Sequence, residues 1–314
     1  MTLIKISNLL KASQNEDYLI GCIECWNYES AIAIISAAEE VNCPVVLFTG
    51  EPAIKLLGMR NLARMILDLA VYSKIPVACH IEAVNDHTIL FEAIKYGFPS
   101  VIYDGSELPI EQNIRNTKEL VQVAHAVGVE VEAQIGSMPL SETGTGYEKI
   151  DFSKHKTRID EAEFFVQQTK IDILAPNLGN VHGLYKEKIK TLDLDLANAL
   201  VDRIGLPITL HGGTGIPDEI LSEAKKSKLS MVYFATSIFE NFRSCLKSSI
   251  DTKSGYGSVS DIECECRDNL KSYVEERLIF LESRKYFNPY SKLENLQLEK
   301  ITKIITDEIL KSIK

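Results

Sequence analysis

The chain has 314 residues, of which 45% are hydrophobic and 25% charged, and these fractions exclude a disordered or collagen-like protein. Lys and Arg number 34 against 44 Asp and Glu, so the formal net charge is −10. This acidic balance argues against a protein that binds nucleic acid, whose surface usually carries a basic stripe. The negative net charge does not exclude a small anionic substrate, because a few hydrogen-bond donors in the binding site outweigh the electrostatic field of the whole protein.

Neither a membrane nor an oxidising compartment is expected. No run of about 18 apolar residues occurs, and the start of the chain lacks the apolar core of a signal peptide. The seven cysteines are an odd number in a long chain, which favours reduced thiols over disulfides. We therefore expect a cytoplasmic protein.

Over most of the chain, short apolar runs alternate with longer helical patterns. The runs lie at 18–25, 44–50, 76–82, 100–106, 129–136, 172–179, 207–215 and 231–238. Several are β-branched and nearly continuous, as expected of strands buried on both faces. Helical patterns follow at 28–41, 57–73 and 109–128, and the last begins with a proline and ends with a glycine, as helices often do.

Eight strand–helix repeats predict an α/β fold, a (β/α)8 TIM barrel with extra C-terminal helices. A doubly wound open sheet is the alternative, but the lack of a Gly-rich dinucleotide loop favours closure. We expect the barrel over residues 1–250 and a helical extension over 251–314. Its helices, at about 261–284 and 293–313, are expected to pack on the barrel or on a second subunit.

In such a barrel the chemistry lies at the C-terminal ends of the strands. Polar side chains stand at or just after those ends: Glu24, His80, Glu82, Asp104, Glu132, Gln134, Asn177, His182, His211 and Thr236. Burying such groups without partners is costly, so a functional site is the simplest reason for them.

Three segments carry most of the functional signal. NVHGLYK (180–186) offers an imidazole, a glycine and a lysine, LHGGTG (210–215) a second imidazole before a Gly-Gly-Thr turn, and ATS (235–237) a strand-end hydroxyl. Backbone amides and a hydroxyl in the last loops form the usual phosphate site of a barrel. The glycine-rich segment either binds phosphate or merely turns the chain, and its place directly after His211 favours phosphate.

These segments resemble the class II, zinc-dependent ketose-bisphosphate aldolases, the family of the fructose- and tagatose-bisphosphate aldolases. Residues 101–136 are similar to that family throughout, and PVACHIE (76–82), HGLYK (182–186) and LHGGTGIPDE (210–219) match it in order. The resemblance covers about residues 1–245. It implies a barrel that forms a homodimer or homotetramer and cleaves a phosphorylated ketose, its small-molecule partner, into dihydroxyacetone phosphate and an aldehyde. In the family, zinc held by three histidines polarises the ketone.

The family's functional residues map onto this chain one by one. Its second and third zinc histidines fall on His182 and His211. Its phosphate-binding positions correspond to Gly183, Lys186, Gly212, Gly213, Thr214, Ala235 and Thr236. The other expected pocket residues are His80, Asp104, Glu132, Gln134 and Tyr233.

The first departure from the family pattern is at the third strand. The family ends this strand in His-Leu-Asp-His, where the Asp moves a substrate proton and the last His is the first zinc ligand. Here the match is His-Ile-Glu82-Ala83. Glu82 keeps a carboxylate for acid–base work, whereas Ala83 cannot bind a metal. The family's Gly-Gly-Glu-Glu loop reads SMPLSE (137–142), which leaves Glu142 as a second catalytic acid.

Further departures concern side chains around the aldehyde end. Glu24 stands where the family has Asn, and Gln134 where it often has Glu. Tyr233 replaces an Asn that touches the substrate, while Phe48 and Gly50 replace a Gln and a Ser. The residues that bind phosphate in the family are therefore kept, whereas the residues around the aldehyde part of the substrate differ.

Three outcomes for the metal stay open. A carboxylate, Glu82 or Glu24, joins the two histidines in a site for Zn²⁺, Mn²⁺ or Fe²⁺. Alternatively, the segment 85–87 (Asn-Asp-His) acts as a displaced copy of the family's Asp-His pair, although its Asp also fits a plain helix N-cap. In the third outcome no metal binds.

Two functions follow from these outcomes. The first is an aldolase-type lyase with an altered substrate, in which Glu82 and Glu142 act as catalytic acids. The second is a non-catalytic barrel that binds a sugar phosphate, supported by Ala83, Gln134 and Tyr233, which are non-ionic where the family has working groups. The new carboxylates favour the changed enzyme, because a decaying site more often gains apolar residues.

Overall fold

The computed structural model describes residues 3–14, 16–83, 86–137, 140–141, 155–183, 192–252 and 258–287. Within this part of the chain, each predicted strand run coincides with one strand of a parallel sheet, and only the third strand extends a residue beyond its run. The strands are β1 (Ile20–Glu24), β2 (Val45–Thr49), β3 (Val77–Ala83), β4 (Ser100–Asp104), β5 (Glu130–Ile135), β7 (Ile173–Pro176), β9 (Thr209–Leu210) and β10 (Met231–Phe234).

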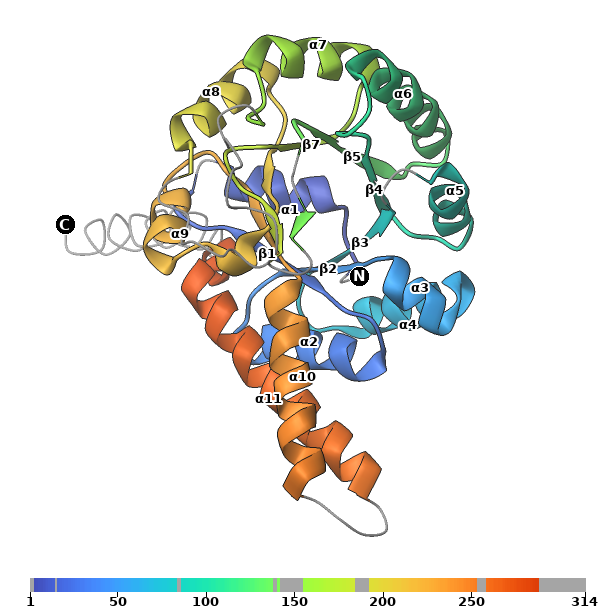
Figure 1. The fold of residues 1–314 in the computed structure, drawn as a ribbon, viewed down its shortest axis with the longest axis vertical. Helices are drawn as coiled ribbons and strands as arrows, with labels where there is room; N and C mark the ends of the chain where they lie inside the picture. The colour runs from blue at the N-terminus through green and yellow to red at the C-terminus, as the bar shows by residue number, and fades with distance from the viewer. Residues whose placement is uncertain are drawn as a thin grey trace, which may run out of the picture.

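The sheet closes into a barrel. Its strands pair in the order β7-β5-β4-β3-β2-β1-β10-β9, and a parallel bridge between Leu174 and Ile208 joins the two ends. At this seam the backbone N–H of Leu174 donates to the carbonyl of Pro207 at 3.1 Å. The predicted TIM barrel with C-terminal helices is confirmed (Figure 1). A separate pair, β6 (Leu140–Ser141) and β8 (His182–Gly183), joins the loops after β5 and β7.

Helices surround the strands, as Figure 1 shows. They are α2 (Tyr28–Glu40), α3 (Glu51–Leu57), α4 (Met59–Tyr72), α5 (His87–Lys95), α6 (Ile110–Ala126), α7 (Ile159–Thr169), α8 (Leu194–Ile204) and α9 (Asp218–Ala224). Local sequence sets their ends: Asn27 and Ser30 form a reciprocal capping box at α2. The pattern at 57–73 becomes α4 alone, because Gly58 with φ of +72° separates it from α3.

Two apolar clusters hold the barrel together. The larger one lies between the strands and the outer helices, and the smaller one fills the interior. Helix α1 (Ile6–Ser13) contributes Ile6, Leu9 and Leu10 to the interior cluster, so it closes the N-terminal end of the barrel. Its backbone N–H at Ser7 donates to the carboxylate of Glu130, at the start of β5, over 3.2 Å.

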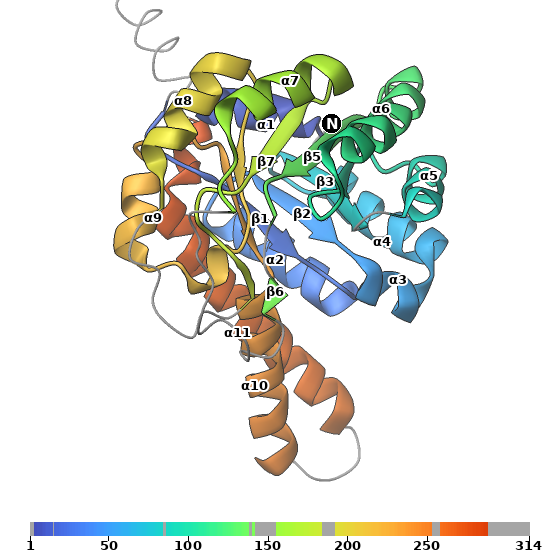
Figure 2. The same cartoon turned by 45° about the horizontal axis from the view of Figure 1, so that its top comes forward.

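The C-terminal helices α10 (Thr236–Thr252) and α11 (Ser258–Leu281) form a hairpin that extends away from the barrel (Figures 1 and 2). The end of α11 packs on the barrel, where the Leu281 carbonyl accepts from the Leu19 N–H at 3.1 Å, and a short 3₁₀ helix, Ser283–Phe287, follows. The predicted run 231–238 was too long, because the strand ends at Phe234 and α10 begins at Thr236. Among the described helices, none combines the length and apolar composition that a membrane span needs.

Candidate active site

The site begins with side chains that point into the barrel. Every second residue of a strand faces inward, as Cys22, Phe48 and Tyr233 do in the interior cluster. Alternate strands supply the members of one layer in such a barrel. The strand registers place Glu24, Glu82, Gln134 and His211 in the layer at the C-terminal mouth, above His80, Glu132 and Thr209.

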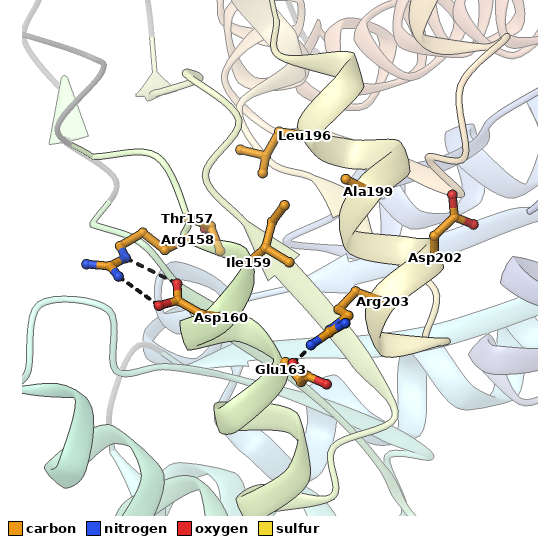
Figure 3. Close-up of a pocket in the computed structure, with 9 residues that line it drawn as sticks. All are labelled: Thr157, Arg158, Ile159, Asp160, Glu163, Leu196, Ala199, Asp202 and Arg203. Carbon is orange, nitrogen blue, oxygen red and sulfur yellow. Dashed lines mark hydrogen bonds and ion pairs between the residues drawn. The ribbon is translucent and has the colours of Figure 1, made fainter.

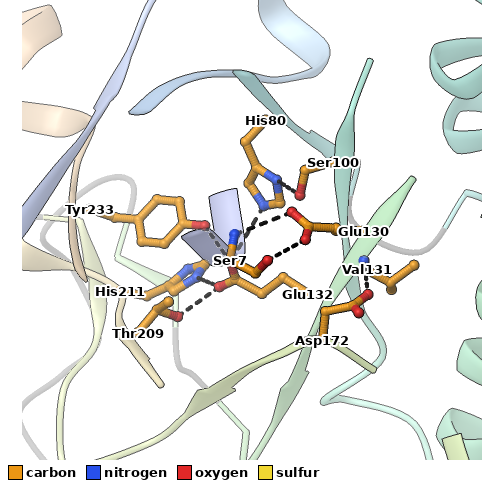
Figure 4. A network of polar contacts seen from close by, with 10 residues as sticks. All are labelled: Ser7, His80, Ser100, Glu130, Val131, Glu132, Asp172, Thr209, His211 and Tyr233. Atoms are coloured by element: carbon orange, nitrogen blue, oxygen red, sulfur yellow. Dashed lines mark hydrogen bonds and ion pairs between the residues drawn. The ribbon is translucent and has the colours of Figure 1, made fainter. Parts of the chain in front are cut away.

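Glu132 is the centre of a buried hydrogen-bond network (Figure 4). Its Oε1 accepts from the Thr209 hydroxyl at 2.7 Å and lies 3.1 Å from Nε2 of His211. Its Oε2 accepts from the Tyr233 hydroxyl at 2.8 Å. Glu132 is fully buried and His211 and Tyr233 are almost so, which makes these contacts strong and specific.

His211 and Glu132 stabilise each other's charged forms. Burial alone would lower the pKa of His211, but the hydrogen bond to Glu132 and the charges of Glu132, Glu82 and Asp104 raise it overall. Burial would likewise raise the pKa of Glu132, but the bond to His211 and the charges of His80 and His211 lower it overall.

His80 lies below the mouth and is fully buried. Its Nδ1 lies 2.8 Å from the Ser100 hydroxyl, while its Nε2 lies 3.5 Å from Oε2 of Glu132, too far for a good hydrogen bond. Burial lowers the pKa of His80 to about 4, against the opposing charge of Glu132, so the ring is neutral near pH 7.

Glu24 and Glu82 face the mouth from the strands on either side of β2. Burial, with the nearby charge of Glu82, raises the pKa of Glu24 to about 8. Burial also raises the pKa of Glu82, with His211 opposing and Asp104 and Glu132 adding to the rise. Glu24 is therefore suited to hold or exchange a proton near neutral pH, and the pKa of Glu82 is shifted in the same direction.

Asp104 and Gln134 end neighbouring strands on the same side of the mouth. The carboxylate of Asp104 accepts from the Ser106 N–H at 3.0 Å, and the Gln134 amide donates to the Ser106 hydroxyl at 3.3 Å. The Oε1 atom of Gln134 is buried and has no hydrogen-bond partner among the described residues. It is an acceptor that a ligand at the mouth could satisfy.

The predicted phosphate residues of the last two loops lie together. The Thr214 hydroxyl accepts from the backbone N–H of Ser237, at the start of α10, over 3.1 Å. Gly212 adopts φ of +69°, and a Cβ on Gly213 would lie 2.6 Å from the Tyr233 carbonyl oxygen. Both glycines thus have a structural reason as well, because they let the loop turn and pack against β10. Ala235 and Thr236 lie at the junction of β10 and α10.

Of the predicted site residues in the loops after β5 and β7, the structure describes only some. The pairing of β6 with β8 brings the segment before Glu142 beside His182 and Gly183. The side chain of His182, together with Glu142 and Lys186, lies outside the described residues. Asn180, which the sequence did not single out, ties this loop to the site, because its amide donates to the His211 carbonyl at 2.9 Å. The sequence pattern Asn-Leu-Gly-Asn at 177–180, typical of a turn stabilised by side chains, could have identified Asn180.

The metal prediction has one described donor of suitable geometry. Nε2 of His211 faces the Glu132 carboxylate, an arrangement by which proteins orient a metal-binding imidazole. His211 therefore fits a metal ligand. Among the described residues no three His, Cys, Asp or Glu side chains surround one point, although the His182 side chain is not among them.

The displaced copy at residues 85–87 is not supported. The Asp86 carboxylate accepts from the Thr88 N–H at 2.8 Å and caps α5, as its alternative reading predicted. The His87 ring packs on Phe91 and on Tyr103, with centroids 5.5 and 5.2 Å apart. Tyr103 belongs to the cluster outside the barrel, so His87 lies on the other side of the barrel wall from His211.

Away from the mouth, a groove of about 830 Å³ lies between α7 and α8 (Figure 3). Four of its charged side chains pair with each other, Arg158 with Asp160 at 2.7 Å and Arg203 with Glu163 at 2.8 Å, while Asp202 pairs with Lys228 outside the lining. It includes none of the residues predicted for the site.

Comparison with known proteins agrees with the resemblance read from the motifs. The family model described as fructose-bisphosphate aldolase class-II matches residues 4–285. Fructose-bisphosphate aldolase of Streptococcus pneumoniae serotype 4 is 36% identical over 236 residues, which is 74% of this chain and 78% of that protein. Fructose-bisphosphate aldolase of Thermus caldophilus is 35% identical over 214 residues, 68% of this chain and 69% of that one.

A solved structure supports the same assignment. The YdjI aldolase from Escherichia coli K12 superposes with a TM-score of 0.79 at 27% identity, covering 90% of this chain and 98% of that one. Sequence and fold therefore agree over the barrel and into the C-terminal helices. The chain belongs to the class II fructose-bisphosphate aldolase family.

Proposed function

We propose that the chain is a metal-dependent lyase that cleaves a phosphorylated ketose by a retro-aldol reaction into dihydroxyacetone phosphate and an aldehyde. The observation that carries this proposal is the position of His211. Its ring is fixed by Glu132 at the barrel mouth, directly before the loop whose Thr214 contacts the start of α10.

The phosphate end of the substrate would lie on these last two loops. Backbone N–H groups at the start of α10 point out of the barrel end, where the helix dipole favours an anion. Gly213 and Thr214 bring a second stretch of backbone to the same place, and Lys186 and Gly183 would complete the site from the loop after β7. This arrangement would hold the phosphate while the rest of the ketose reaches the mouth.

The metal would be held by His182 and His211, with a carboxylate, Glu82 or Glu24, in place of the missing third histidine. Two imidazoles and a carboxylate suit Zn²⁺, Mn²⁺ or Fe²⁺. A metal bound there would supply Lewis-acid polarisation of the ketone carbonyl. Glu132 supports this role by fixing the ring of His211 through its Nε2 atom.

Where Glu24 rather than Glu82 is the third metal ligand, Glu82 is the proposed acid–base group. It occupies the position of the family's proton-moving Asp, and burial raises its pKa, a shift that favours proton exchange by a carboxyl group. Glu142 is the proposed second acid. When the carbon–carbon bond breaks, Glu82 would take the proton of the hydroxyl that becomes the aldehyde, and a proton is returned to the three-carbon fragment.

The substrate is proposed to differ from fructose 1,6-bisphosphate. Phe48 and Tyr233 stand where the family has polar side chains, and their rings are in edge contact at 5.0 Å inside the barrel. We further propose a homodimer or homotetramer, as the family resemblance implies, and a cytoplasmic location, as the sequence analysis expects.

The deciding experiment is a screen of the metal-loaded protein against phosphorylated ketoses, with dihydroxyacetone phosphate as the measured product. We expect turnover on at least one ketose and its loss in His211→Ala. A fully active His211→Ala protein would remove the metal role from this residue.

A second function is a sugar-phosphate-binding barrel without lyase activity. The Tyr233 hydroxyl favours it, because it is engaged by Glu132 rather than turned toward a substrate. Tight binding of a ketose phosphate with no product in the same screen would establish this alternative.

A further inference from the structure

We propose that the part of the barrel mouth formed by β1 to β5 binds an uncharged, hydroxyl-rich chain, so that the ketose carries one phosphate and not two. This inference rests on the proposed function, because it takes the loops after β9 and β10 as the place of the single phosphate. It adds the chemical class of the rest of the substrate, a polyol chain without a second phosphate.

The mouth has two arcs of different chemistry. Strands β1 to β5 follow one another around the barrel and form the acceptor arc, and β7, β9 and β10 complete the circle as the phosphate arc. The loop with Thr214, which contacts the start of α10, belongs to the phosphate arc. The carbons of a ketose held there are expected over the acceptor arc, because Glu82, the proposed acid–base group, lies on β3.

Four strands of the acceptor arc present side-chain oxygens at the mouth: Glu24 on β1, Glu82 on β3, Asp104 on β4 and Gln134 on β5. After β2 comes Gly50, and a Cβ at this position would lie 3.9 Å from Oε1 of Glu24. Beyond the effect of burial, the charge of Glu82 raises the pKa of Glu24, and the charge of Asp104 raises the pKa of Glu82. The carboxyl groups therefore lie near one another.

Two of these groups are buried without the hydrogen-bond donors that such atoms normally have. Oε1 of Gln134, a fully buried residue, has no partner among the described residues. Glu24 is only 9% exposed, and its carboxyl group has no hydrogen bond to any part of the chain that the structure describes. Unpaired buried acceptors are costly, so both groups are suited to hydroxyl donors that a ligand brings.

The loops of the acceptor arc also lack the cations that a second phosphate needs. By sequence, the segments between strand and helix after β1 to β4, at 25–27, 50, 84–86 and 105–109, contain no lysine or arginine. Proteins bind phosphate with such cations or with clustered N–H groups. An ionised carboxylate only accepts, and a protonated one offers a single O–H to the three oxygens of a phosphate. The acceptor arc therefore disfavours a phosphate and favours hydroxyl groups.

The test compares how a hexitol 1-phosphate and a hexitol 1,6-bisphosphate bind the full-length protein, by titration calorimetry. Both lack the ketone, so neither is cleaved and the comparison does not depend on lyase activity. Glu24→Gln removes one carboxylate from the mouth and keeps the shape of the side chain. The matched control is Glu92→Gln, which makes the same change on the exposed face of α5. Asp104→Asn is a second probe of the acceptor arc.

We expect the wild type to bind the monophosphate at least about 10-fold more tightly than the bisphosphate, because like charges placed side by side weaken binding. Glu24→Gln should reduce this preference about threefold or more, and Glu92→Gln should leave it unchanged. Equal or tighter binding of the bisphosphate by the wild type would overturn the inference. An unchanged preference in both Glu24→Gln and Asp104→Asn would overturn it too, as would failure of both hexitols to bind.

The same experiments separate this inference from the lyase. A preference for the monophosphate, without cleavage of any ketose phosphate in the screen, would leave the inference standing and remove the lyase. Cleavage of a ketose bisphosphate, together with tighter binding of the hexitol bisphosphate, would keep the lyase and overturn the inference.

Discussion

At the mouth of the barrel, Glu82 takes the place of an aspartate in the family pattern and is one methylene longer. Replacing it by glutamine keeps the shape but removes the proton-accepting oxygen. We expect Glu82→Gln to lower kcat by about 10²–10⁴-fold with little change in KM, because general acid–base catalysis contributes this much. Steady-state kinetics on the best ketose found in the screen would measure it.

The control for this variant is Glu92→Gln, which makes the same change on the exposed face of α5 and should leave kcat unchanged. Wild-type kcat in Glu82→Gln would assign the proton transfer to another group, with Glu142 as the first to examine.

Inward-facing residues could be predicted from alternation along each strand, but their partners could not. Glu132 was expected in the pocket because it stands near the end of a predicted strand and because the family has an acid there. That it collects Thr209, His211 and Tyr233 depends on how far each strand is shifted against the next, which a single sequence does not contain. Nor does the sequence say that Tyr233 would turn to this acid rather than toward a substrate.

The loop between β9 and α9 depends on a glycine that has no room for a side chain. A Cβ on Gly213 would lie 2.6 Å from both the Tyr233 carbonyl oxygen and Cγ2 of Val232. We therefore expect Gly213→Ala to reduce the free energy of unfolding by about 1–3 kcal/mol and to raise KM for the phosphorylated substrate, because the loop must move. Urea denaturation and kinetics measure the two effects.

Gly50→Ala is the matched control for stability, since its Cβ would meet nothing closer than the Glu82 carbonyl at 3.4 Å. Equal destabilisation in both variants would show that the close approach at Gly213 does not constrain the loop.

Helix α11 is part of the barrel's packing through its last turns. Leu278 is fully buried, and one of its methyl carbons lies 2.9 Å from where a side chain on Gly21 of β1 would begin. We expect Leu278→Ala to cost about 2–5 kcal/mol of unfolding free energy, as truncations in a filled core do. Ile279→Ala, at a neighbouring side chain that is 61% exposed, should change it by less than about 0.5 kcal/mol. Similar urea midpoints for the two variants would contradict this packing.

Most elements could be predicted because apolar runs and helical periodicity alternate so regularly. Their ends could not be predicted as well: the run at 231–238 stays apolar from β10 into α10, since Ile238 is buried by the barrel just as the strand is. The pattern alone cannot tell a buried strand from the buried start of a helix. The division of the chain at residue 250 stays a prediction.

For the molecule as a whole, the metal decides between an enzyme and a binding protein. We expect about one Zn, Mn or Fe per chain by elemental analysis. A chelator should abolish ketose cleavage, and one of these ions should restore it. Turnover on fructose 1,6-bisphosphate should stay below the usual enzyme range of about 1–1000 per second. Full activity after complete metal removal, or turnover on this substrate within that range, would contradict the proposal.

Helix α1 closes the N-terminal end of the barrel with Ile6, Leu9 and Leu10, and this has a kinetic consequence for a reaction that makes two products from one. In the proposed cleavage, substrate and both products must pass through the opposite end. If the phosphorylated fragment is gripped by the loops there, the aldehyde departs first and the phosphate ester second. Product-inhibition patterns would then report an ordered release, imposed by the grip of the loops on the phosphate rather than by the chemistry.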